Sequence, residues 1–202
     1  MEKFNITDLN IDSLILKADQ LHLDISGYEF KRSISFERFN HYDELSDQLR
    51  NGRLNDGYQI TNEQYKVALK NLNMLKHEID LIFNDVDLII TPSAPGEALE
   101  GLEYTGSPIF NTTWSLNGNP CITLPFFKGE KKLPIGCQLV AKFGNDNQLL
   151  NHAKNLLDLS NSPCPLRYVS FIKFSALLLS IPFILTKIAL ITGSSFWVNQ
   201  FT

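Results

Sequence analysis

A cysteine nucleophile with a histidine base is the first chemistry to consider in this sequence, because both residue types are present. A thiol attacks a carbonyl carbon well only when a neighbouring base takes its proton. Cys121 and His152 would form such a pair only if the fold brought them together. Cys121 follows Pro120 at the predicted start of a strand, where a small buried residue is ordinary. We therefore predict a structural role for Cys121.

The other residues with metal or redox chemistry are too scattered to form a site. None of the four histidines pairs with another at the spacing of metal ligands. They are His22, His41, His77 and His152. The three cysteines are widely spaced, and Cys-x-x-Cys does not occur. A glycine-rich phosphate motif is also absent. We expect no metal, no disulfide framework and no cofactor.

The composition is that of a globular domain with a real core. The chain has 202 residues, of which 44% are hydrophobic and 20% charged. Its net charge is −4 and no basic patch stands out, so nucleic acid is not an expected partner. The first residues form no apolar secretory signal, and a cytoplasmic protein is the default expectation.

Helical periodicity covers much of the first half of the chain. Apolar residues at three- and four-residue spacing predict a helix over 11–40, which Gly27 could interrupt, and a short helix over 43–50. Residues 51–52 and 55–57 have the composition of turns. Thr61 and Gln64 fit a capping box that opens a long amphipathic helix over 61–84.

The second half alternates short apolar runs with polar connections. Runs at 86–91, 121–126 and 135–141 predict buried strands. Residues 96–120 predict a long connection, and connections of that length inside a domain usually border a site. Asn145 or Asp146 can cap a further amphipathic helix. The order of elements predicts an α/β fold with a mixed sheet flanked by helices.

Four motifs follow one another in a specific order. The first runs from Asp85 to Gly96, the second from Phe110 to Pro120, the third from Leu133 to Val140, and the fourth from Gly144 to Leu150. Together they resemble the C-terminal portion of an amidase signature enzyme, with the resemblance covering about residues 20–158. The resemblance implies a fragment of the amidase signature fold and hydrolysis of a carboxamide C–N bond.

The catalytic half of that family has no counterpart in this sequence. The family uses a Ser–Ser–Lys triad in which a neutral lysine activates the serine, and a glycine-rich loop stabilises the oxyanion. The segment from Lys31 to Ser35 has the right residue types but no glycine, and it falls in a predicted helix. We therefore assign no catalytic residue.

The resemblance leaves part of a substrate pocket as the candidate site. In the family, the loop before the Gly-x-Pro turn borders the substrate, and here that loop holds Asn111, Thr113 and Trp114. These three are the candidate substrate-binding residues; the alternative is that Trp114 is core and the polar residues satisfy loop backbone. At the position of a substrate-binding acid in amidotransferases this chain has Ser107 and Pro108, which favours a generic amidase ancestry.

The C-terminal residues differ sharply from the rest. All 22 acidic residues lie at or before Asp158. We predict an amidase part over 1–158, a linker over 159–167 and a hydrophobic tail over 168–202. The tail is open to three interpretations, namely a marginal membrane segment, a frameshifted extension without selected structure, or a helix that packs on a partner.

These observations predict a truncated amidase-like protein that is inactive alone. Its partner would be a small amide substrate, and only if the missing N-terminal half were supplied. The alternatives are a non-catalytic, membrane-associated binding module that uses 168–202, and one half of a split amidase.

Overall fold

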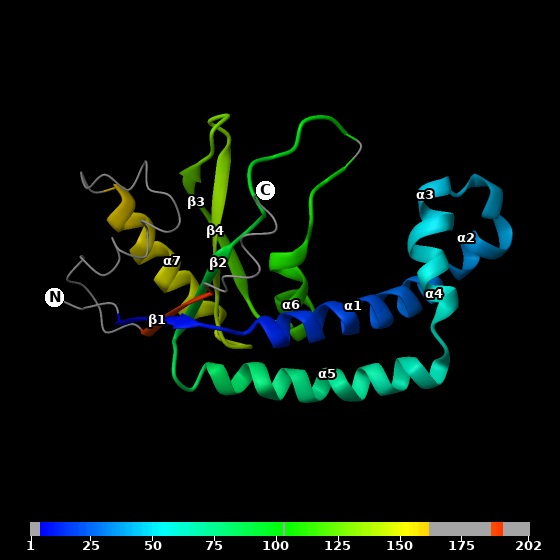
Figure 1. Cartoon of the computed structure of the whole chain (residues 1–202), viewed down its shortest axis with the longest axis horizontal. Helices are drawn as coiled ribbons and strands as arrows, with labels where there is room; N and C mark the ends of the chain where they lie inside the picture. Colours follow the sequence, from blue (N-terminus) through cyan, green and yellow to red (C-terminus); the bar gives the residue numbers. More distant parts are fainter. Residues whose placement is uncertain (1–4, 103, 162–186, 192–202) are drawn as a thin grey trace. The chain divides into compact units, whose positions relative to one another are not determined.

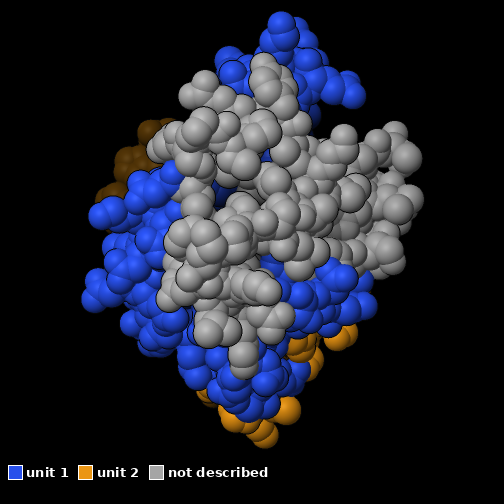
Figure 2. Space-filling model, turned by 90° about the vertical axis from the view of Figure 1, so that its left-hand side faces the viewer, with its two compact units in different colours: residues 1–12, 78–202 blue, residues 13–77 orange. Residues whose placement is uncertain are grey.

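The computed structural model describes residues 5–102, 104–161 and 187–191 of the chain (Figure 1). It divides into two compact units (Figure 2). Unit 1 comprises residues 1–12 and 78–202, and unit 2 comprises residues 13–77. Helices and a mixed sheet together make an α/β structure, as the sequence predicted.

All the secondary-structure elements of unit 2 are helices. Most of α1 (Asp12–Ser33) and of α5 (Asn62–Ile82) lies in it, and these are its two long helices. Between them come α2 (Ser35–Asn40), η1 (Tyr42–Glu44), α3 (Asp47–Leu49), η2 (Arg50–Leu54) and α4 (Asn55–Gln59). The predicted helix over 11–40 is thus two helices, separated at Ile34.

The predicted capping box at the start of α5 is confirmed. The backbone N–H of Gln64 donates to Thr61 Oγ1 at 3.2 Å, and the backbone N–H of Thr61 donates to Gln64 Oε1 at 2.8 Å. Each side chain satisfies a backbone donor that the first turn of a helix leaves without a partner. These two hydrogen bonds fix where α5 begins.

Three local predictions in unit 2 are wrong. Gly27 does not interrupt α1, and residues 51–52 and 55–57 belong to η2 and α4 rather than to turns. Gly57 instead lies against α1, where a Cβ would collide with the carbonyl oxygen of Gly27. Gly52 alone keeps a non-helical backbone, with φ −98° and ψ −109°, inside η2. Glycine therefore marks a close helix contact and a kink here, which the turn rule does not distinguish.

Unit 1 is built on a five-stranded mixed sheet with the order β1-β5-β2-β4-β3. The strands are β1 (Asn5–Leu9), β2 (Leu88–Pro92), β3 (Cys121–Lys128), β4 (Pro134–Val140) and β5 (Lys187–Ile191). Strands β1, β5 and β2 are parallel, whereas β4 is antiparallel to both β2 and β3. The three strands predicted from apolar runs are confirmed as β2, β3 and β4. The prediction that all three are buried is wrong for β3, which lies at the edge of the sheet and exposes alternate residues.

The core of unit 1 lies between the sheet and α7 (Asp146–Asn161). Helix α7 packs against β3 and β4. Leu149, Ala153 and Leu156 recur at helical spacing on its buried side. They meet alternate residues of the strands, which include Ile90, Leu124, Cys137 and Leu139.

The outer strand β3 has features that discourage pairing with another chain. A register irregularity lies between Leu124 and Phe127, and Pro125, within it, has no backbone N–H to donate. Lys128 adds a charge at the end of the strand. Bulges, proline and lysine are common protections of sheet edges.

The structure describes only part of the predicted linker and tail. Helix α7 continues to Asn161, so it includes the first residues of the predicted linker over 159–167. Residues 187–191 of the predicted tail form β5, and the rest of 168–202 lies outside the described residues. No helix in the described part of the chain is long and apolar enough to span a bilayer. The boundaries at 158 and 167 and the membrane segment stay predictions.

Candidate functional site

The candidate site lies on the face of the sheet opposite α7. In the strand register Thr91 pairs with Gln138, and Gln138 pairs with Thr123, so the three side chains form a polar row across β2, β4 and β3. Their neighbours in sequence, such as Ile90 and Leu139, belong to the core on the α7 side. Because side chains alternate along a strand, the polar row faces away from α7.

A short helix, α6 (Ile109–Asn117), is fastened over this polar row. Gln138 Nε2 donates to the backbone oxygen of Phe110 at 2.9 Å, and Asn111 Nδ2 donates to the backbone oxygen of Ser93 at 3.1 Å. The first bond ties α6 to β4, and the second ties it to the end of β2. The sheet and two amide side chains therefore set the position of the helix.

The sequence predicted no helix here, only a connection over 96–120. The segment is rich in Asn, Thr and Ser, which are weak helix formers, and is only nine residues long. Its C-terminal signal is nevertheless clear. Gly118 adopts φ +82° and, with Asn119, donates its backbone N–H to Trp114 O, as in the glycine-terminated end of a helix. Gly118 therefore ends α6.

Glycine at position 136 permits the close approach of the chain after β2. A Cβ on Gly136 would collide with Ser93 Oγ and with Thr123 Cγ2. The backbone N–H of Ser93 donates to Gly136 O at 3.2 Å. Gly136 therefore allows close backbone packing within β4.

The three predicted substrate-binding residues all lie on α6 but differ in exposure. Asn111 is half-buried and uses its amide to hold Ser93. Trp114 is 2% exposed and belongs to the packed interior. Thr113 is also 2% exposed, and its hydroxyl has no hydrogen-bond partner among the described residues. The structure thus places them on one helix, and no bound substrate tests their role.

A chain of amides at the end of α6 was missed in the sequence. Asn119 Nδ2 donates to the backbone oxygen of Ala141 at 2.8 Å, and Asn117 Nδ2 donates to Asn119 Oδ1 at 2.5 Å. Because the first bond fixes which Asn119 atom is oxygen, the second leaves Asn117 Oδ1 as an acceptor. That oxygen has no partner among the described residues. Thr113 and Asn117 are four residues apart, so both unsatisfied oxygens lie on one side of α6.

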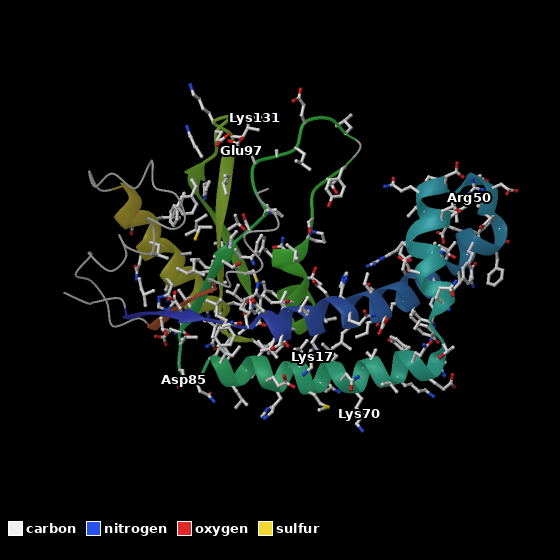
Figure 3. All side chains as sticks on the ribbon, viewed as in Figure 1. Lys17, Arg50, Lys70, Asp85, Glu97 and Lys131 are labelled. Atoms are coloured by element: carbon white, nitrogen blue, oxygen red, sulfur yellow. The ribbon has the colours of Figure 1, made fainter. Side chains whose placement is uncertain are left out.

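Glu97 holds the first part of the connection between β2 and α6 in place. The carboxylate accepts the backbone N–H of Lys131 at 3.0 Å and that of Leu133 at 3.2 Å, both in the β3–β4 hairpin. Figure 3 shows Glu97 and Lys131 together at the end of this hairpin. Gly129 is required beside them, because a Cβ there would collide with the Glu97 carboxylate. Beyond Glu97, Leu99, Leu102 and Tyr104 are exposed.

Cys121 and His152 are not brought together. The register places Cys121 opposite Val140, on the face away from α7, and His152 lies on α7. Although Cys121 is exposed as a residue, desolvation by burial raises the pKa of its thiol to about 12. A protonated thiol is a poor nucleophile. The structure therefore does not form the Cys121–His152 pair, but Cys121 is exposed rather than buried as the sequence predicted.

No cluster of metal-ligand residues occurs in the described ranges 5–102, 104–161 and 187–191. Burial lowers the pKa of His22 and of His152, with the positive charge of Arg53 adding to the effect at His22. These shifts favour neutral imidazoles packed in the protein.

Known proteins are similar to this chain in sequence and in fold. The Amidase family matches residues 15–150. The A-type subunit of glutamyl-tRNA(Gln) amidotransferase from Wolinella succinogenes is 33% identical over 109 residues, which are 51% of this chain and 24% of that protein. The corresponding protein of Neorickettsia sennetsu is 32% identical over 135 residues, which are 62% of this chain and 26% of that protein. The chain therefore spans about a quarter of the length of these relatives.

Solved structures agree with the sequence match. The crystal structure of an amidase has a TM-score of 0.62 and 25% identity, covering 72% of this chain and 36% of that protein. A 6-aminohexanoate cyclic dimer hydrolase has a TM-score of 0.58 at 19% identity and shows the shared fold. The sequence relatives are amidotransferase subunits, a class that Ser107 and Pro108 argued against. The matched range includes β2, α6, β3 and β4, and the chain belongs to the amidase family.

Proposed function

We propose that this chain is the C-terminal part of a serine amide hydrolase and that these 202 residues alone do not hydrolyse amides. The observation that carries the proposal is the extent of the match, because the chain corresponds to about a quarter of its relatives. The polar side chains over the sheet support it, since Asn111 and Gln138 are engaged in holding backbone oxygens of the fold. In this proposal the site is a pocket wall, and the reactive groups belong to the part of the enzyme that this chain does not match.

The complete reaction needs catalytic groups that, according to the resemblance, belong to the part of the enzyme that this chain does not match. A serine would attack the carboxamide carbon, a neutral lysine would take its proton, and backbone N–H groups would stabilise the oxyanion. Ammonia or an amine would then leave as the acyl-enzyme forms. In this scheme α6 contributes one wall of the substrate pocket through Asn111, Thr113 and Trp114, with Trp114 acting through packing. A small amide is the proposed partner only when the remaining part of the enzyme is supplied.

The direct test measures ammonia release from simple primary carboxamides, such as propionamide and benzamide, by the purified chain. We expect no release above that of buffer. The chain should be prepared from a host that lacks its own amidases, so that contamination cannot produce a signal. Turnover that rises in proportion to the amount of chain would contradict the proposal.

The alternative of one half of a split amidase is favoured by an exposed part of the sheet. Cys121, Thr123 and Pro125 of β3 are exposed on the face away from α7. In a longer relative, additional chain could cover this face. The test is co-expression with the N-terminal part of one of the amidotransferase relatives, followed by co-purification and an amidase assay. Activity that needs both chains would support the split enzyme, and separate elution without activity would count against it.

The alternative of a membrane-associated binding module depends on the composition of 168–202. Its test is fractionation of the full chain with membranes. Membrane association that disappears when residues 166–202 are deleted would support the module. An unchanged distribution would contradict it.

A further inference from the structure

Two strands of the sheet lie outside the residues that match the Amidase family. The match covers 15–150, whereas β1 is formed by Asn5–Leu9 and β5 by Lys187–Ile191. The strands within the match are β2, β4 and β3, in that spatial order. Segments from both sides of the matched range therefore extend the sheet beyond β2.

These two strands cover the edge of β2 that β4 leaves free. Strand β5 pairs in parallel with β2, with Leu88 opposite Ile188 and Ile90 opposite Leu190. Strand β1 pairs in parallel with the other edge of β5. Figure 1 shows the blue β1 and the red β5 side by side at the end of the sheet.

An open β2 edge would be hazardous to the protein. Every residue of β2 is buried, and the Leu-Ile-Ile-Thr sequence has high β-propensity and no charge. An unpaired edge of such a strand presents free N–H and C=O groups to any extended chain. The strand that replaces β2 as the outermost one carries exposed Thr7 and Asp8, and a charged outer strand is a poor template for further pairing.

We propose that Lys187–Ile191 is a closing strand, which occupies a strand-binding site along the β2 edge and excludes an extended segment of a second polypeptide. The site takes a parallel strand, and its occupant is this segment of the same chain. The proposal is independent of amidase activity and of the proposed function.

The register of β2 and β5 gives a direct test in the full chain. Ile89 is opposite Ala189, so oxidation should form a disulfide in an Ile89→Cys/Ala189→Cys variant with Cys121 and Cys164 replaced by serine. The matched control is Ile89→Cys/Leu190→Cys. A shift of one residue turns the second thiol to the opposite face of the sheet, so the control should remain reduced. Equal oxidation of both pairs, or of neither, would overturn the proposal.

A second test measures occupancy of the β2 edge. A fluorescent peptide with the sequence of residues 185–193 is titrated into the wild-type chain and into an Ala189→Pro chain, because proline is excluded from central strands. The variant should bind at least about tenfold more tightly than the wild type, and a peptide with the same proline should not bind. Equal binding by both chains, or no binding by a variant with a native circular dichroism spectrum, would overturn the proposal. If the variant does not fold, the disulfide pair decides.

Discussion

Gly57 faces the carbonyl oxygen of Gly27 so closely that a side chain at position 57 has no room. A Cβ there would overlap that oxygen and would lie 2.9 Å from the Cβ of Lys31. Both partners belong to α1, which cannot give way as a flexible side-chain end could. We expect Gly57→Ala to destabilise unit 2 by about 1–3 kcal/mol, measured by urea unfolding of the full chain, although alanine is the better helix former.

Gly52 provides the matched control for this substitution. It also lies in a helical segment of unit 2, but no atom lies within 4 Å of the position of its Cβ, and its φ is negative. Gly52→Ala should therefore destabilise the chain less than Gly57→Ala does, because its Cβ overlaps no other atom. Equal losses from the two substitutions would show that the contact with Gly27 is not the cause.

The sequence predicted the elements whose signals are local. The hydroxyl and amide of the capping box identified the start of α5, and apolar runs identified β2, β3 and β4. In each case the residues whose types predicted the element are the same residues that form it. Helix α6 was missed because its stability comes from bonds made by Gln138 and Ser93, which are distant in sequence.

The arrangement of the sheet could not be predicted in the same way. Strand β5 lies in a segment interpreted as a hydrophobic tail, because its apolar residues suit a strand, a membrane or a partner equally well. Its position between β1 and β2 depends on pairing between residues far apart in the chain. At the candidate site, the sequence identified Asn111 and Thr113 as polar residues. It did not predict that Asn111 donates to a backbone oxygen or that the Thr113 hydroxyl has no hydrogen-bond partner among the described residues.

Glu97 should stabilise the β3–β4 hairpin through two backbone hydrogen bonds. Its carboxylate accepts the N–H groups of Lys131 and Leu133, and hydrogen bonds to a charged acceptor are stronger than neutral ones. Glu97→Ala should lower the free energy of unfolding by about 1–3 kcal/mol and speed hydrogen exchange in the hairpin.

Glu100 is the control for the charge of Glu97. It is 93% exposed and lies 3.6 Å from the Lys131 ammonium, an ion pair in full contact with water. Exposed pairs of this kind contribute little, so Glu100→Ala should be close to neutral. Equal losses of stability from Glu97→Ala and Glu100→Ala would show that the negative charge, and not the two backbone hydrogen bonds of Glu97, stabilises the hairpin.

Cys137 should make the stability of unit 1 fall in alkaline solution. Burial in the core raises the pKa of its thiol from 9.0 to about 12. Between those values the unfolded chain loses the proton and the folded chain keeps it. The protonated Cys137 thiol therefore makes its full contribution to the free energy of unfolding below pH 9. This contribution is lost progressively as the pH rises towards 12.

The measurement compares urea midpoints at about pH 8 and about pH 10.5 for the wild type and Cys137→Ala. At the lower pH the Cys137→Ala variant is expected to be less stable than the wild type, because the substitution leaves a cavity in the core. On going to the higher pH the variant should lose less stability than the wild type. Other alkaline groups titrate in both proteins and cancel in the difference. Identical pH dependence would contradict the assignment.

Thr113 is the opposite case, because its buried hydroxyl should lower the free energy of unfolding. Its Oγ1 is buried without a hydrogen-bond partner in the described part of the chain, whereas Thr91 Oγ1 donates to the backbone oxygen of Pro92 at 3.3 Å. Valine has nearly the shape of threonine, so Thr→Val removes the hydroxyl with little change in packing. Removing an unsatisfied hydroxyl should raise the free energy of unfolding by up to about 1 kcal/mol at Thr113, and removing a bonded one should lower it by a similar amount at Thr91. Urea unfolding of the two variants checks the difference in sign. A clear loss of stability from Thr113→Val would mean that this hydroxyl is bonded in solution, and it would leave less reason to treat Thr113 as available to an amide substrate.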